Sequence, residues 1–330
     1  MNIFISTTGK GLTRAARVAN EQWTVENLLD GQEITCLAAD PIQAGVVYAG
    51  TRGAGVICST DGGKSWSPAG LSGQTVKALA ASPHIPGAIY AGTKPACVFI
   101  SQDGGQHWQE FTAFRKIFSR HFWFSPAETP FTAYVQGIAL SPTDPNVILV
   151  GIEAGAVVRS TDGGETWGDH RKGALRDCHS ITFHASDGAW AYEAGGSGAG
   201  IAISQDSGNR WMQPAGLDRH YGWACAADPI HPDVCYASIS PSPFKAHGDG
   251  NAQAYIFRSN GNAGWQKLGG GLPQPLDHMP YALLTHPSEP GHVYAGLSNG
   301  DVWRSQDHGN AWDRLPFNLK SIHRSLIMLP

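Results

Sequence analysis

A short pattern of the form Ser-x-Asp-x-Gly-x-x-Trp recurs along the chain and constrains its fold more than any other feature. Five good copies and one decayed copy, SNGNAGW, are present. They begin at Ser59, Ser101, Ser160, Ser204, Ser259 (the decayed copy) and Ser305. Successive copies start 42, 59, 44, 55 and 46 residues apart. Self-similarity at this period indicates a solenoid or a propeller.

The residues of the repeat are suited to a tight turn. The Asp side chain can accept backbone N–H groups next to a following Gly, and the Trp can pack back under the turn as an anchor. The pattern resembles the Asp-box, or BNR repeat, of sialidases, xyloglucanases, sortilin-type receptors and photosystem II assembly factors. In that family the box closes the hairpin between the third and fourth strands of a propeller blade. The resemblance therefore implies a structural role, not a catalytic one, for Asp61, Asp103, Asp162, Asp206 and Asp307.

Seven segments have the pattern of innermost blade strands, and most of them end in Asp-Pro, Ser-Pro or His-Pro. They are ITCLAADP, VKALAASP, VQGIALSP, CHSITFHA, GWACAADP, YALLTHP and HRSLIMLP. The last segment has no blade after it, and the N-terminal NIFISTTGKGL has no inner strand before it. We therefore expect an all-β fold, a single seven-bladed β-propeller domain over residues 1–330. Strands within 1–30 should complete the last blade with 321–330, which removes an open sheet edge.

Composition excludes several classes of function. Only 15% of the residues are charged and the formal net charge is −4, so we expect no broad basic face and no nucleic-acid partner. No apolar run approaches the roughly 18 residues of a membrane span, so no membrane association is expected. The N-terminal residues do not have the pattern of a signal peptide, and the six cysteines lack a C-x-x-C pair. Free thiols and a cytoplasmic location are the corresponding expectations.

Strand direction assigns the unusual residues to one face. In a four-stranded blade, the turns between strands two and three lie on the face that carries the connections between blades, opposite the Asp-boxes. Second strands should end at Thr8, Arg52, Lys94, Glu153, Glu193, Ser240 and Ser298, taken as equivalent positions. Inner strands should begin at Thr35, Lys77, Gln136, His179, Trp223, Tyr281 and Arg324. A ring of mixed charge is thus predicted around the mouth of the central channel.

Two glutamates and a histidine are the catalytic candidates. Glu153 and Glu193, expected in equivalent positions of adjacent blades, could serve as a paired acid and base, with the pKa of one raised by proximity. They are equally consistent with ion pairs to basic neighbours such as Lys94. His179 follows an aspartate at the start of an innermost strand and is the third candidate.

Further residues are candidates for ligand binding. The run at 217–223 is dense in groups that stack on sugar rings or hold a carboxylate, and the run at 273–280 presents an acid and a histidine in a similar place. Two long loops, 112–133 and 240–253, enlarge the same face, and the aromatic residues of the first either wall a ligand site or pack on themselves. The binding candidates are Arg52, Lys94, Trp123, Asp177, Arg219, His220, Tyr221, Trp223, Asp277 and His278.

No cofactor is implied, and we expect no metal, because the candidate ligands come from different blades without local ligand spacing. A divalent metal at the mouth would have to draw on His179, His220, His278 and His323 with Glu153 or Asp177. The resemblance covers several functions, so the fold does not choose among them. Arg52, Arg219 and Arg324 could match the arginine triad of sialidases, but the Arg-Ile-Pro motif is missing and a sialidase is disfavoured.

Two hypotheses therefore stay open. In the first, the propeller binds and processes a small molecule or glycan at the channel mouth, in the manner of a glycosyl hydrolase. In the second, it is a non-catalytic scaffold or binding module that uses the same face for a protein or saccharide. Whether the chain is an enzyme is left open.

Overall fold

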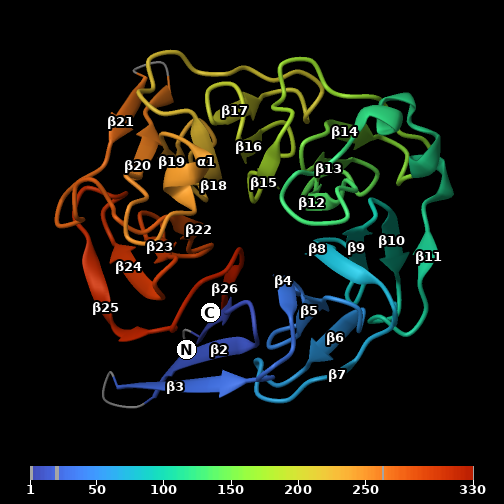
Figure 1. The fold of residues 1–330 in the computed structure, drawn as a ribbon, viewed down its shortest axis with the longest axis horizontal. Helices are drawn as coiled ribbons and strands as arrows, with labels where there is room; N and C mark the ends of the chain where they lie inside the picture. The colour runs from blue at the N-terminus through green and yellow to red at the C-terminus, as the bar shows by residue number, and fades with distance from the viewer. Residues whose placement is uncertain (1–2, 19–21, 262–263, 330) are drawn as a thin grey trace.

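Seven antiparallel sheets form a closed ring around a central channel, and each sheet is one blade of a β-propeller (Figure 1). The computed structural model describes residues 3–18, 22–261 and 264–329. The prediction of a seven-bladed all-β fold is confirmed. Residues 1–2, 19–21 and 330 of the expected closing blade, and 262–263 of the decayed repeat, lie outside the described residues.

Blades 1 to 4 follow one another along the chain, each with its innermost strand first. Blade 1 comprises β4 (Ile34–Ala39), β5 (Val47–Thr51), β6 (Val56–Ser59) and β7 (Ser67–Pro68). Blade 2 comprises β8 (Thr75–Ala81), β9 (Ile89–Lys94), β10 (Val98–Ser101) and β11 (Gln109–Glu110). Blade 3 comprises β12 (Val135–Leu140), β13 (Ile148–Ile152) and β14 (Val157–Ser160). Blade 4 comprises β15 (Cys178–Phe183), β16 (Ala191–Gly195) and β17 (Ile201–Ser204).

The remaining blades close the ring. Blade 5 comprises β18 (Tyr221–Ala227), β19 (Cys235–Ser240), β20 (Tyr255–Ser259) and β21 (Trp265–Lys267). Blade 6 comprises β22 (Pro280–Thr285), β23 (Val293–Leu297), β24 (Asp301–Ser305) and β25 (Asp313–Asn318). Blade 7 comprises β26 (Leu326–Leu329), β1 (Ile3–Thr7), β2 (Leu12–Arg17) and β3 (Trp23–Leu28). The helices of the described residues are η2 (Thr112–Lys116), η3 (Phe118–Phe122) and α1 (Pro243–Ala246), all within the two long loops.

Both ends of the chain meet in blade 7, as predicted. The C-terminal strand β26 pairs antiparallel with the N-terminal β1, with Ile3 opposite Leu329 and Ser6 opposite Leu326. Between the blades, apolar clusters fill the space. Tyrosines at equivalent places in the second strands are buried in these clusters: Tyr48, Tyr90, Tyr192, Tyr236 and Tyr294.

Each good Asp-box is a closed hydrogen-bonded turn. In the first box, Ser59 Oγ donates to Asp61 Oδ1 (2.8 Å) and accepts from Gly63 N (2.9 Å). Asp61 Oδ1 also accepts from the backbone N–H groups of the two residues before the Trp, and Trp66 Nε1 donates to Gly63 O (3.1 Å). The same Ser–Asp–Gly contacts recur in the other four good copies. These aspartates therefore hold turns on the face opposite the channel mouth.

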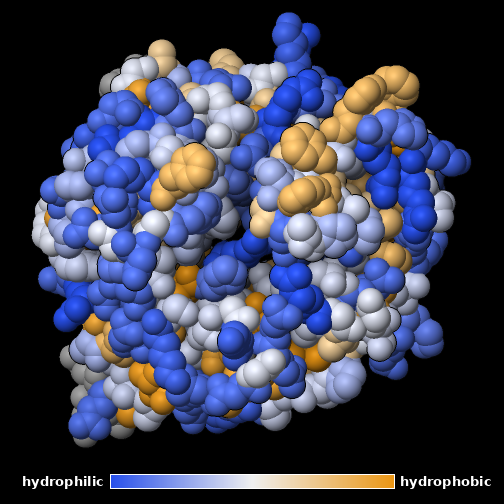
Figure 2. Space-filling view, viewed as in Figure 1, coloured by the Kyte–Doolittle hydropathy of each residue, from blue (hydrophilic) through white to orange (hydrophobic). Residues whose placement is uncertain are grey.

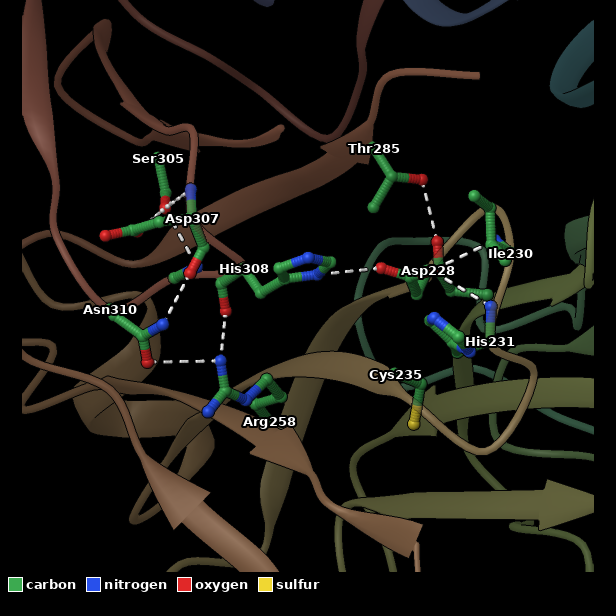
Figure 3. Close-up of polar contacts among 12 residues, drawn as sticks. Asp228, Ile230, His231, Cys235, Arg258, Thr285, Ser305, Asp307, His308 and Asn310 are labelled. Atoms are coloured by element: carbon green, nitrogen blue, oxygen red, sulfur yellow. Dashed lines mark hydrogen bonds and ion pairs between the residues drawn. The ribbon is translucent and has the colours of Figure 1, made fainter. Parts of the chain in front are cut away.

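The Asp-box face also carries contacts between blades (Figure 3). Asp228, in the first turn of blade 5, accepts from the backbone N–H groups of Ile230 (2.9 Å) and His231 (3.0 Å). Its other oxygen lies 3.1 Å from Nδ1 of His308, which belongs to the Asp-box of blade 6. Arg258 of β20 donates to the backbone oxygen of His308 (2.6 Å). Blade 5 is thus joined to blade 6 by a buried carboxylate and a guanidinium.

Candidate functional site

The innermost strands direct one side chain each into the channel by means of a β-bulge. In six blades, the pairing of the innermost strand with its neighbour skips one or two residues near its start. A bulged residue leaves the ladder, and its side chain is re-aimed. In blade 7 the equivalent residue is Arg324, which lies just before β26 and has a φ of 79°. The channel is lined by the expected ring of Thr35, Lys77, Gln136, His179, Trp223, Tyr281 and Arg324.

The channel itself is narrow. Its volume is about 230 Å³, below the roughly 300–1,000 Å³ of most sites for drug-sized ligands. Beneath the ring, small and aliphatic residues of the innermost strands, such as Ala78, Gly137 and Leu283, line the wall. A ligand inside the channel can therefore be no larger than about one ring, and a longer molecule would have to lie across the mouth.

Glu153, Asp177 and His179 come together at this mouth from blades 3 and 4. Glu153 directly follows β13, Asp177 precedes β15, and His179 is the bulged residue of β15. Nε2 of His179 lies 3.5 Å from Asp177 Oδ2 and 4.0 Å from Glu153 Oε2. Nδ1 of His179 lies 2.7 Å from the backbone oxygen of Gly222. Because a carbonyl only accepts, Nδ1 carries a proton and Nε2 faces the two carboxyls.

The two carboxyl groups are shifted in opposite directions. Burial raises the pKa of Glu153 above its ordinary value. Burial also acts to raise the pKa of Asp177, but the hydrogen bond and charge of His179 outweigh it and lower that pKa overall. Burial acts to lower the pKa of His179, but Asp177 and Glu153 together raise it. Glu153 therefore keeps its proton to a higher pH than Asp177 does.

Glu193 does not belong to this group, and the expectation that it is equivalent to Glu153 is wrong. Glu153 stands one residue after β13, whereas Glu193 is in the middle of β16, opposite Ile181 and Ala202. The true equivalent in blade 4 is Gly196, and a Cβ there would lie 2.0 Å from Asp177 Oδ2. The carboxylate of Asp177 thus fills the place that a side chain takes in the neighbouring blades.

The environment of Glu193 is closed to solvent. Its side chain is fully buried, and Oε2 accepts a hydrogen bond from Leu175 N (2.8 Å). Burial raises the pKa of Glu193 well above its ordinary value. An alignment of the buried tyrosines of the second strands, Tyr48 with Tyr192, would have shown the error. It makes Glu193 equivalent to Ala49, which lies inside blade 1.

Aromatic rings form one wall beside His179. The indole of Trp223 stacks on the His179 ring at a centroid distance of 4.5 Å, and Tyr221 lies 5.0 Å away. Trp223 also contacts Tyr281 at 4.9 Å. His247, from the 240–253 loop, bridges the two phenols: Tyr221 Oη is 2.8 Å from its Nε2 and Tyr281 Oη is 2.7 Å from its Nδ1. The candidates Tyr221 and Trp223 therefore lie at the site.

Arg52 and Lys94 lie at the mouth on blades 1 and 2, where they contact an acid from the 112–133 loop. Arg52 Nη2 is 2.7 Å from Glu128 Oε2, and Lys94 Nζ donates to Glu128 O (2.9 Å). Lys77, from the ring, also pairs with Glu128. The sequence contains a signal for Glu128 that our sequence reasoning missed: it is the single acidic residue in a loop otherwise rich in basic and aromatic residues.

Glu153, Asp177 and His179 are called the triad below, and four other candidates lie outside the channel lining: Arg219, His220, Asp277 and His278. Arg219 is paired with Asp218 (2.6 Å) and lies 4.1 Å over the ring of Tyr255 on β20, outside the channel lining. His220 and Asp277 are exposed, and neither they nor His278 line the channel in the described part of the chain. Trp123 packs against the buried Phe114 at 5.9 Å and donates to Ser119 Oγ (3.2 Å). These residues are positioned by their own loops and blades.

The 112–133 loop both packs on itself and presents rings to solvent. Phe114 and Ile117 are buried in the apolar cluster of blade 3, and Trp123 packs against it. Four phenylalanines of the same loop are between 55% and 72% exposed: Phe118, Phe122, Phe124 and Phe131. In Figure 2, apolar side chains gather over this loop and at the position of α1, on either side of the hollow at the channel. The loop thus packs partly on itself, and its role as a ligand wall stays a prediction.

The triad is also the one group that could hold a metal ion in the described part of the chain. The ligand atoms of Glu153, Asp177 and His179 all lie within 4.8 Å of one another. The backbone oxygen of Gly222 holds the Nδ1 proton, so Nε2 is the His179 nitrogen that would coordinate such an ion. The other histidines considered for a metal are not in this group.

Comparison with known proteins agrees with this architecture. A family model described as the BNR/Asp-box repeat matches residues 57–68. The chain folds as a β-propeller and carries Asp-box repeats. No curated protein matches the sequence. The fold is similar to that of an ancestral GH74 enzyme, with 22% identity, a TM-score of 0.66, and coverage of 85% of this chain and 38% of that one.

Two further solved structures share the propeller fold. The GH74 xyloglucanase from Xanthomonas campestris is 18% identical with a TM-score of 0.68, over 94% of this chain and 52% of that one. YCF48 from Cyanidioschyzon merolae is 15% identical with a TM-score of 0.58, over 88% of this chain and 87% of that one. This propeller spans about half or less of the GH74 proteins. At these identities the likeness concerns the fold alone.

None of the helices in the described residues is long and apolar enough to cross a membrane. The cytoplasmic location and the absence of a nucleic-acid partner stay predictions from the sequence.

Proposed function

We propose that the channel mouth binds a small hydroxyl-rich ligand of the saccharide type, and that Glu153 and Asp177 act on its glycosidic bond. The observation that carries this proposal is the pair of carboxyls with opposite pKa shifts on either side of His179. Two titratable groups pushed apart in this way are the usual arrangement of an acid and its complementary base. The aromatic wall beside them supplies the apolar surface on which sugar rings stack.

Each residue then has a defined task. Glu153, which keeps its proton, donates it to the leaving oxygen, while ionised Asp177 attacks the anomeric carbon or stabilises its positive charge. One oxygen of each carboxyl lies within 4.8 Å of the other. This is shorter than the roughly 6.5–9.5 Å that leaves room for the water of an inverting glycosidase, so we propose a retaining reaction. His179 is a positioning residue that keeps Asp177 ionised, and Glu193 is structural.

The size of the channel restricts the ligand. A cavity of about 230 Å³ admits a single ring, so the sugar that is cleaved would enter the mouth and the aglycone would lie outside. Similarity to xyloglucanases supports a saccharide ligand only at the level of the fold.

The test is hydrolysis of a panel of 4-nitrophenyl glycosides by the wild-type chain, Glu153→Gln and Asp177→Asn. Each variant should lower kcat by about 10²-fold or more, with little change in KM. Glu165→Gln, at an exposed position of the third Asp-box, is the matched control. Added EDTA and divalent cations separate acid–base catalysis from a metal-dependent reaction of the same triad. Absence of both turnover and binding across the panel would contradict the proposal.

A second candidate is the binding of a peptide or protein across the same face. It is favoured by the exposed phenylalanines of the 112–133 loop together with Phe244, which is 90% exposed on α1. One similar solved structure is YCF48 bound to D1 peptide, so a propeller of this fold presents a peptide-binding surface. Selection from a peptide library would test this candidate, and Phe118→Ser with Phe122→Ser should abolish capture if the loop is the docking surface.

A further inference from the structure

Four basic side chains converge on blades 1, 2 and 7, next to the triad. Lys77 is the bulged residue of β8, Lys94 ends β9, Arg52 follows β5, and Arg324 precedes β26. The side chains of Lys77 and Lys94 are only 2% and 7% exposed. Buried cations of this kind are rare unless they are paired with negative charge. The chain has a formal net charge of −4, so four cations in one place are a marked local excess of positive charge.

The cations gather around one buried ring. Lys77 Nζ lies 4.7 Å, Lys94 Nζ 5.7 Å and Arg324 Cζ 5.9 Å from the ring centroid of Tyr134. Burial and the nearby charge of Arg324 lower the pKa of Lys77 to about 8. Burial is the larger cause of this shift and repulsion from Arg324 adds to it, so a negative group beside Lys77 favours its charged form.

Glu128 supplies most of the negative charge, and it comes from a long loop. Its carboxylate pairs with Arg52 (2.7 Å), with Lys77, and with Lys94 (3.5 Å). Glu33 adds a second carboxylate, 3.1 Å from Arg52 at the rim. Burial acts to raise the pKa of Glu128, but Lys77 and Arg52 lower it to about 2. At neutral pH this carboxylate is therefore ionised and stabilised by the cations it contacts.

The segment that carries Glu128 is lightly held. Residues 125–131 form the tip of a hairpin whose stem is the bridge between Phe124 and Thr132. Phe124 and Phe131, on either side of the tip, are 55% and 62% exposed. Segments with few buried apolar contacts open at low free-energy cost. Ser125 at the base of the tip is buried, and Glu128 makes the ion pairs and the hydrogen bond that join the tip to the blades.

From this arrangement we infer that the four cations form a binding site for an oxyanion, a carboxylate or phosphate group of a small ligand, which Glu128 occupies as a tethered substitute. A ligand bearing such a group displaces the loop tip and takes over its ion pairs. The Arg52 guanidinium can contact two oxygens of such a group at once, and the lysines act as point charges. The inference does not depend on glycosidase activity, and a failed glycoside assay leaves it intact.

The test is calorimetric titration of inorganic phosphate and of acetate, at constant ionic strength in sodium chloride. Glu128→Gln should bind at least one of the two anions about tenfold or more tightly than the wild type. Preference for phosphate or for acetate identifies which group the ligand carries. Addition of Lys77→Met to Glu128→Gln should remove the gain. The matched control is Glu110→Gln, which removes an exposed ion pair with Arg115 at the start of the same loop.

Equal affinities of Glu128→Gln and Glu110→Gln for both anions would overturn the inference. If Glu128→Gln does not fold, limited chymotrypsin digestion of the wild type gives the answer. Phosphate or acetate should speed cleavage after Phe124 and Phe131 by releasing the tip. A cleavage rate that neither anion changes would equally overturn the inference.

Discussion

Replacement of Glu193 by glutamine should remove a pH dependence from the stability of the propeller. Glu193 is fully buried in β16, where Oε2 accepts from Leu175 N and Oε1 has no hydrogen-bond partner among the described residues. Burial raises its pKa well above the ordinary value. The carboxyl therefore stays neutral to a higher pH in the folded protein than in the unfolded chain.

The magnitude follows from proton linkage. An acid with a higher pKa in the folded state binds more protons there, so stability is greatest below the unfolded pKa of about 4.3 and falls as the pH rises toward the folded pKa. Each pH unit in this window costs about 1.4 kcal/mol. Between pH 5 and pH 7 this single group should lower the free energy of unfolding by up to about 2–3 kcal/mol. Glutamine cannot ionise and still offers an oxygen to Leu175 N.

Urea unfolding at pH 5, 6 and 7 measures this difference. The free energy of unfolding of Glu193→Gln minus that of the wild type should grow by that amount from pH 5 to pH 7. Other titrating groups are common to both proteins, and any cost of burying the amide is independent of pH. Glu165→Gln removes a carboxyl from an exposed position and is the control. A difference that stays constant with pH would refute the description of Glu193 as a buried, protonated acid.

Three further predictions concern stability. Gly151→Ala should cost about 1–3 kcal/mol, because an added Cβ would lie 2.1 Å from Cys178 Sγ; an unchanged urea midpoint would contradict this packing. Asp228→Ala should cost about 2–3 kcal/mol, since it leaves two backbone N–H groups and His308 without their acceptor. A loss below half of that in chemical denaturation would argue against this contact between blades 5 and 6. Hydrogen bonds from Thr166, then from Ser160, hold the pKa of Asp162 at about 2, so its contribution is present above the unfolded pKa near 3.9 and is lost as the pH falls toward 2. Asp162→Asn should therefore show a shallower loss of stability between pH 4 and pH 2 by circular dichroism, and a curve parallel to that of the wild type would exclude this role.

The fold and the ring of channel residues were predictable because both depend on local patterns. The Asp-box encodes its own turn through contacts within five residues, such as Ser59 Oγ with Gly63 N. Repetition of that turn sets the direction of the strands, and the seven innermost-strand segments set the number of blades. Strand direction then assigns His179 and Trp223 to the mouth, and a bulge at the same place in successive blades turns them into the channel.

The error over Glu193 shows where local patterns become insufficient. Glu193 lies three residues before Gly196, the true equivalent of Glu153, so it is inside the blade and not at the mouth. A shift of three residues moves a carboxyl from a solvated rim into an apolar interior. The resulting difference in pKa is set by burial, which the one-dimensional pattern does not contain.

By itself, the sequence determined that this chain is a closed ring of seven blades with its polar residues gathered at one end of the channel. Only the tertiary structure decided which of those residues act together. Asp177 reaches His179 and Glu153 because Gly196 leaves space for its carboxylate. Glu128 meets Lys77, 51 positions earlier in the printed sequence, because a long loop folds back over blade 2. Such contacts depend on loop paths and on the shape of the space between blades, and neither is encoded in the repeat.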